Sequence, residues 1–160
     1  FNIQKKLQFS GQGSKKYNQL KSDNGQKFTD FLGLSSKWKT SSEYLALYPN
    51  VLLGVHRDHV FSVILQSKDK SLTLEHASLS YAHPECLTPK FEYLRQKNLS
   101  FWETVFKEDI FVVEGMQKGR HGDRFDGGRF APEMDSPTHC FHEWVATKVI
   151  KGRQMQNEVE

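Results

Sequence analysis

Residues 51–65 read VLLGVHRDHVFSVIL, and this stretch decides the fold. Two apolar runs rich in β-branched and aromatic residues, 51–55 and 60–65, flank the polar residues 56–59. Apolar runs of this length that are joined by a short polar segment are typical of a β-hairpin. The sequence therefore predicts two antiparallel strands, with the polar residues between them in a solvated turn.

Further strands are expected on both sides of this hairpin. After the polar residues 67–70, the run 72–79 alternates apolar and polar side chains and predicts a third strand. Before the hairpin, residues 1–40 are mostly polar, and we interpret them as an edge of the sheet. Their one alternating run indicates a strand that ends at a turn over residues 11–14; its apolar members are Phe1, Ile3, Leu7 and Phe9. The sequence thus predicts an antiparallel sheet with one solvent-exposed face.

The second half of the chain has helical patterns. Residues 89–97 have helical composition, and Ser100 with Glu103 matches a capping box, which predicts a separate helix from Ser100 to about Lys118. The dipeptide Ser136-Pro137 predicts the start of a last helix, with a fraying tail from residue 151. Strands followed by helices without β-α-β alternation predict the α+β class, in one domain over residues 1–160.

Composition excludes several classes of function. The 160 residues include 22 Lys and Arg against 19 Asp and Glu, a net charge of +3, and the basic residues are scattered among acidic ones. This distribution argues against nucleic-acid binding. No run approaches the roughly 18 to 20 apolar residues that span a bilayer. Two cysteines, Cys86 and Cys140, indicate reduced thiols, so we expect a cytoplasmic protein without a membrane segment.

One carboxylate lies on an apolar helix face. With about 100° per residue, Asp109 falls at the centre of an apolar stripe; its members are Trp102, Val105, Phe106, Val112, Val113 and Met116. Because a buried unpaired carboxylate is costly, we expect Asp109 to have a partner. Three interpretations remain open: a structural ion pair, a metal ligand, and a general base in a pocket.

The histidines indicate no metal site by their spacing. His56 and His59 lie at the predicted hairpin tip, where a solvated turn is expected. His139 and His142 share a helix face, but without a second ligand pair they are a weak zinc pattern. His142 is instead expected to be a hydrogen-bonded core histidine. Because nucleophile-elbow, Walker and H-E-x-x-H motifs are all missing, the sequence argues against covalent hydrolase chemistry.

Three segments together resemble a known family. Residues 48–61, 108–119 and 141–144 are similar, in order and spacing, to the C-terminal part of the catalytic domain of Rieske non-haem iron oxygenase large (alpha) subunits. These are the ring-hydroxylating oxygenases, and the likeness is greatest to the branch with choline and carnitine monooxygenases and glycine-betaine demethylases. It spans roughly residues 45–150.

This resemblance implies a helix-grip, START-like fold around a mononuclear Fe²⁺ site. In the family two histidines and one carboxylate hold the iron, and Asp109 matches the carboxylate. The histidine pattern D/E-x2-H-x4-H and the C-x-H and C-x2-H pairs of the Rieske 2Fe-2S domain are missing from this chain. We therefore expect the chain to be the rear part of a longer subunit, inactive alone, with the N-terminal Rieske domain outside it.

The resemblance also implies an activity and partners. A Rieske-type mono- or dioxygenase takes electrons from a reductase or ferredoxin and uses O2 to hydroxylate or demethylate a small substrate, here an aromatic acid or a quaternary amine. The family implies a homo-trimer. Glu108 is a candidate for a contact behind the iron ligand or between subunits, and the candidate substrate-pocket residues are Val105, Phe106, Val112 and Val113. The alternative is a non-catalytic helix-grip domain that binds a small apolar ligand, with Asp109 as a polar anchor or in an ion pair.

Overall fold

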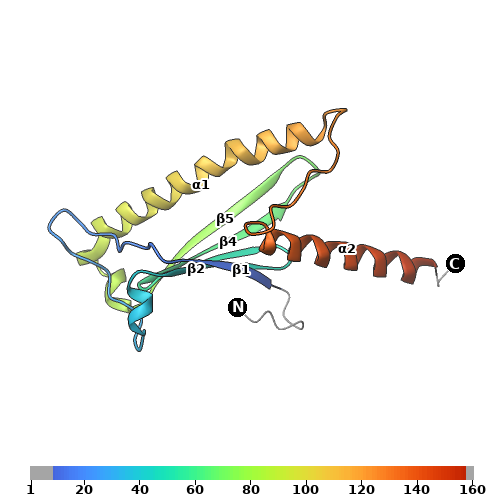
Figure 1. Ribbon diagram of the computed structural model, residues 1–160. Helices are drawn as coiled ribbons and strands as arrows, with labels where there is room; N and C mark the ends of the chain where they lie inside the picture. Colours follow the sequence, from blue (N-terminus) through green and yellow to red (C-terminus); the bar gives the residue numbers. More distant parts are fainter. Residues whose placement is uncertain (1–8, 158–160) are drawn as a thin grey trace.

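The computed structural model describes residues 9–157 and has the predicted α+β class (Figure 1). An antiparallel sheet is followed by two long helices, α1 (Glu92–Arg120) and α2 (Ser136–Asn157). The strands are β1 (Phe9–Ser14), β2 (Ser42–Leu47), β3 (Val51–Val55), β4 (His59–Ser67) and β5 (Thr73–Tyr81). Three short 3-10 helices are η1 (Ser36–Lys39), η2 (Pro84–Leu87) and η3 (Pro89–Phe91).

The sheet is a meander in the order β1-β2-β3-β4-β5, with every neighbouring pair antiparallel. The predicted hairpin is confirmed as β3 and β4, and the predicted third strand is confirmed as β5. The expected turn over residues 11–14 is wrong, because these residues belong to β1 and pair with β2, a strand that was not predicted. Gly11 suits this strand because a Cβ there would lie 2.5 Å from Leu45 Cδ2. Phe1, Ile3 and Leu7 lie outside the described residues.

Helix α1 is continuous, so the predicted helix start at Ser100 is wrong. Ser100 lies inside the helix, and its carbonyl accepts a hydrogen bond from Thr104 Oγ1 at 2.9 Å. Extending an existing helix is less costly than nucleating a second one, so a capping-box spacing inside a helical segment does not interrupt it. Helix α2 begins at Ser136 as predicted, but it continues to Asn157 instead of fraying from residue 151.

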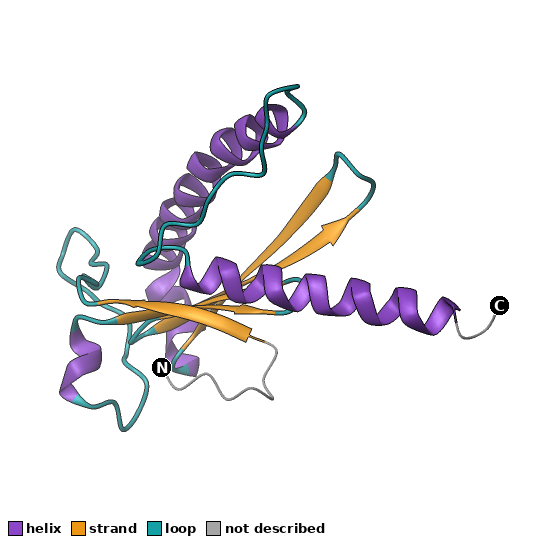
Figure 2. Cartoon of the chain, turned by 45° about the vertical axis from the view of Figure 1, so that its right-hand side comes forward, coloured by secondary structure: helices purple, strands orange, loops and turns teal. Residues whose placement is uncertain are grey.

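Two buried clusters hold α1 to the sheet. Phe28, Cys86, Phe91 and Leu94 form the first cluster, at the start of α1. Phe61, Val63 and Trp102 form the second, which joins β4 to the middle of α1. Beyond this point α1 diverges from the sheet (Figures 1 and 2), and Phe111 is 82% exposed. The C-terminal half of α1 therefore overhangs the sheet as an arm.

Both cysteines are free, in line with the expectation of reduced thiols. Neither long helix contains a segment apolar enough to cross a membrane.

Gly54→Ala is expected to destabilise the sheet by about 1–3 kcal/mol. Gly54 lies opposite Phe61 in the β3–β4 pair, and a Cβ at this position would lie 2.1 Å from the Phe61 ring. Because Phe61 is buried in the second cluster, its ring cannot move without repacking Trp102. Urea unfolding measures the loss. Gly115→Ala on α1, where a Cβ meets open space, is the control and should stabilise by roughly 0.5–1 kcal/mol.

Candidate functional site

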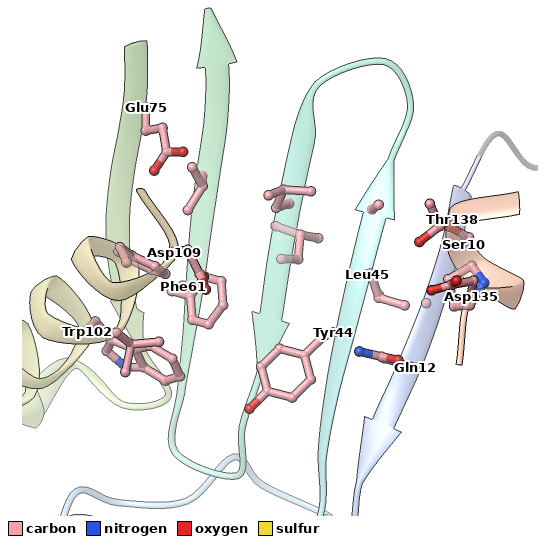
Figure 3. Close-up of a pocket in the computed structure, with 18 of the residues that line it drawn as sticks. Ser10, Gln12, Tyr44, Leu45, Phe61, Glu75, Trp102, Asp109, Asp135 and Thr138 are labelled. Atoms are coloured by element: carbon pink, nitrogen blue, oxygen red, sulfur yellow. The ribbon is translucent and has the colours of Figure 1, made fainter. Parts of the chain in front are cut away.

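A groove of about 720 Å³ lies between the sheet and the two helices. Its size is within the range of small-molecule sites, about 300–1,000 Å³. Strands β1 to β4 form the floor, which is largely apolar along β2 to β4 and polar at Ser10 and Gln12 of β1. Helix α1 forms one wall, and the start of α2 closes the opposite side. Figure 3 shows Asp109 and Trp102 at the α1 side, and Asp135 and Thr138 at the β1 side. Glu75 of β5 is the third carboxylate of the lining.

Asp109 projects into this groove from α1, but it is exposed rather than buried. The expectation of a buried carboxylate with a partner is therefore wrong. The physical reason is that α1 diverges from the sheet after Phe106, so the described residues leave the rest of the stripe, Val112, Val113 and Met116, more than half exposed. Within residues 9–157 the carboxylate forms no hydrogen bond and no ion pair. It is thus a hard oxygen donor that faces the groove and is not engaged by the described part of the chain.

The structure brings together some of the other predicted site residues. Val105 and Phe106 line the groove beside Asp109 and pack against the second cluster. Val113 lines a continuation of the groove between α1 and the β4–β5 connection. Val112 is 53% exposed and lines neither part. Glu108 is exposed, and among the described residues it has no ion-pair partner.

The described residues do not complete a metal site by themselves. No group of three His, Cys, Asp or Glu side chains within this part of the chain is arranged to hold a metal ion. His139 and His142 are exposed and meet Phe130 edge-on, so the expectation of a core histidine at position 142 is wrong. Asp109 is a single free carboxylate at the groove, and no His, Cys, Asp or Glu pair among residues 9–157 stands with it to complete a metal site.

The polar turn of the hairpin is not solvated, which is the largest difference from the sequence-based expectation. His56, Asp58 and His59 are only 1%, 0% and 2% exposed. The segment between β1 and β2 folds back across this turn, and Tyr17 Oη and Gln19 Nε2 donate hydrogen bonds to the Asp58 carboxylate at 3.0 and 2.9 Å. The turn is therefore a buried polar cluster at one end of the sheet.

His59 joins this cluster to α1. Its Nδ1 lies 2.8 Å from Asp58 Oδ1, and its Nε2 lies 2.9 Å from Trp102 Nε1. An indole N–H can only donate, so His59 Nε2 is the acceptor and His59 Nδ1 carries the proton donated to Asp58. Burial by itself would raise the pKa of the Asp58 carboxyl, but the hydrogen bonds from His59, Gln19 and Tyr17 outweigh it and lower that pKa. Asp58 is thus a buried anion with three donors.

His56 is the unsatisfied member of the cluster. Its ring stacks on the His59 ring, with centroids 4.6 Å apart, and lies 4.7 Å from the Tyr17 ring. Neither of its ring nitrogens has a hydrogen-bond partner among the described residues. Burial, together with the charge that a protonated His59 would carry, lowers the pKa of His56 from 6.5 to about 3. Burial beside Asp58 raises the pKa of Tyr17.

A local signal for this burial exists in the sequence. His59, Phe61 and Val63 alternate along β4, so they share the face of the strand that packs against α1. Extending this alternation from Phe61 two residues toward the N-terminus would have placed His59 in the core. The partners on the N-terminal segment and on α1 had no such signal.

The fold and the groove define a class of protein: an α+β, helix-grip-like domain with a ligand-sized apolar site between its sheet and its long helix. The sequence matches the family described as the ring hydroxylating alpha subunit (catalytic domain) over residues 5–151, so the chain belongs to that family of oxygenase catalytic domains. Among curated proteins and solved structures, none was similar enough to this chain to count as a match. The narrower likeness to the choline and carnitine monooxygenase branch stays a prediction.

Proposed function

We propose that this chain forms the substrate groove and supplies the carboxylate ligand of the mononuclear iron site in a Rieske-type oxygenase subunit. The observation that carries the proposal is the position of Asp109, a carboxylate on the groove wall that no hydrogen bond or ion pair of the described residues engages. Iron bound in such a site supplies the reductive activation of dioxygen. The two histidine ligands, the 2Fe-2S cluster and the reductase or ferredoxin donor then lie outside this chain.

The chain's own residues have two tasks in this proposal. Asp109 holds one position at the iron as an unprotonated oxygen donor, which suits a hard metal ion. The floor and α1 wall hold a small, largely apolar substrate and exclude water from it, and their central members are Phe61, Val63, Val105 and Phe106. The substrate is an organic molecule of modest size, an aromatic acid or a quaternary amine, that is hydroxylated or demethylated. Glu108, next to the ligand, faces solvent and is the candidate for a contact with a neighbouring subunit.

Asp109→Ala is expected to remove the mononuclear iron without unfolding the protein. Because Asp109 is exposed and has no partner among residues 9–157, the free energy of unfolding should change by less than about 0.5 kcal/mol. The measurement is the iron content of the full native protein, purified anaerobically, with the iron of the 2Fe-2S cluster counted separately from its visible absorbance. We expect at least a tenfold loss of mononuclear iron and of oxygen consumption, with an unchanged cluster.

Glu103→Ala on the same helix is the matched control. Glu103 is exposed and makes only a 4.0 Å ion pair with Lys107, so iron content and oxygen consumption should be unchanged. Unaltered mononuclear iron in Asp109→Ala would refute the ligand assignment. Binding of a small apolar molecule in the groove of an iron-free protein would then favour the non-catalytic alternative.

A further inference from the structure

Trp102 makes the outermost hydrogen bond between α1 and the sheet among residues 9–157. Among residues 9–157 it is the last α1 side chain, counted from the N-terminus of the helix, that hydrogen-bonds to another element. Its indole is 5% exposed and packs on Phe61, with ring centroids 4.5 Å apart. Further along the helix, Val105 and Phe106 still pack against this cluster. Beyond them the helix overhangs the sheet (Figure 1).

Asp109 follows Trp102 by seven residues. At about 100° and 1.5 Å per residue, this separation is two turns, about 10 Å along the axis, on the same helix face. Any tilt or rotation of α1 at Trp102 therefore moves the Asp109 carboxylate across the groove. Because Asp109 has no hydrogen bond to the sheet among the described residues, its location depends on how α1 is held at Trp102 and by the packing of Phe106.

The hydrogen bond of the Trp102 indole depends on Asp58 and His59 in the buried turn. The Trp102 N–H needs an acceptor, and His59 Nε2 is one only while the His59 proton is on Nδ1. The anionic Asp58 keeps the proton there, and Asp58 is itself fixed by donors from the N-terminal segment. A buried chain of hydrogen bonds thus runs from the first part of the protein to the middle of α1.

We propose that the hydrogen-bond chain from Asp58 through His59 to the Trp102 indole positions Asp109 over the groove. His59 and Trp102 are positioning residues in this inference, since they lie two turns from the carboxylate and act on it through α1. The inference rests on the proposed function for its catalytic meaning. Its structural content, the placement of the arm that bears Asp109, can be tested without iron.

The test measures the distance between α1 and the β4–β5 connection. Spin labels are attached at Ser71→Cys and Glu114→Cys in a Cys140→Ser background, while Cys86 stays because it is 0% exposed. A tilt of about 10° at Trp102 moves Glu114, about 18 Å further along the helix, by about 3 Å. We expect Trp102→Phe to shift the mean distance by about this amount or to double its spread, because it removes the N–H.

A second variant separates the hydrogen bond from packing. Benzothienylalanine at position 102 keeps the two-ring shape and replaces the indole N–H by sulfur, so it should give the same displacement while the packing on Phe61 is kept. The matched control is the same pair of substitutions at Trp144, whose buried indole N–H has no partner among the described residues. These should leave the distance unchanged.

Two outcomes would overturn the inference. An unchanged distance in both variants at position 102 would mean that packing alone holds the arm. A displacement in Trp102→Phe that benzothienylalanine does not reproduce would assign the effect to ring volume. The distance measurement needs no bound metal, so a failure of Asp109 as an iron ligand would leave its result intact.

Discussion

Asp58→Ala is expected to lower the free energy of unfolding by about 3–5 kcal/mol, the largest effect of any single substitution considered. The Asp58 side chain is 0% exposed, and three donors converge on its two oxygens. Alanine would leave the Tyr17 hydroxyl and the His59 N–H without this acceptor. The Gln19 amide would lose one of its acceptors and keep Phe28 O and Asp30 Oδ1. Each unsatisfied buried group costs about 1–3 kcal/mol. Urea unfolding, followed by Trp fluorescence and by circular dichroism, measures the loss.

Asp58→Asn gives an intermediate point on the same scale. The asparagine carbonyl oxygen can still accept from His59 and Tyr17, whereas its NH2 group opposes the Gln19 amide, so we expect a loss of about 1–2 kcal/mol. Asp123→Ala in the exposed loop after α1 is the control and should change stability by less than about 0.5 kcal/mol. If Asp58→Ala were no more damaging than Asp123→Ala, the buried hydrogen-bond cluster would not contribute to stability.

The hairpin was predictable because its information is local. Residues 51–55 and 60–65 contain apolar and β-branched residues at strand spacing, and the pairing of β3 with β4 needs a connection of only a few residues. Strand β1 was mistaken for a turn because Gly11 and Gly13 are turn formers by composition. In the folded chain Gly11 serves instead to let β2 approach closely. The glycines at positions 11 and 13 are compatible with a turn and with a strand that has a close neighbour. Only the position of β2 distinguishes the two structures.

The helical wheel found the correct neighbours of Asp109 but not its burial. Periodicity specifies which side chains share a helix face, and the structure places Asp109, Trp102 and Phe106 together along the groove. Whether that face is covered depends on elements elsewhere in the chain. Here α1 leaves the sheet after the second cluster, so Asp109 stays exposed.

The buried polar cluster was missed because its contacts are long-range. Tyr17 lies 41 residues before Asp58, and Trp102 lies 43 residues after His59. A sequence window around HRDH contains four polar residues and none of these partners, which is the composition of a solvated turn. Non-local hydrogen bonds of this kind leave almost no trace in local composition, and they are what joins the turn to α1.

His56 is expected to make the protein sensitive to acid well above the pKa values of ordinary carboxyl groups. Its pKa is about 3 in the folded protein and 6.5 when the side chain is free in the unfolded chain. Between these values the unfolded state binds a proton that the folded state does not, so stability falls as the pH falls. The slope approaches about 1.4 kcal/mol per pH unit below pH 6, and the loss amounts to about 2.5 kcal/mol between pH 7 and pH 4.5. The lowered pKa of Asp58 adds a further loss only at lower pH.

The measurement is a series of urea unfolding curves from pH 7 to pH 4.5, compared with the His56→Phe variant. Phenylalanine keeps a flat ring within the stack against His59 and Tyr17 but cannot take up a proton, so most of the slope should disappear even if the variant is less stable overall. His76→Gln is the control, because His76 is exposed on β5 and its one side-chain hydrogen bond among the described residues is with Gln66, at 3.1 Å. A slope that survives in His56→Phe would place the acid sensitivity elsewhere. A slope that is lost in His56→Phe and kept in His76→Gln would show that the buried, unpaired ring of His56 carries it.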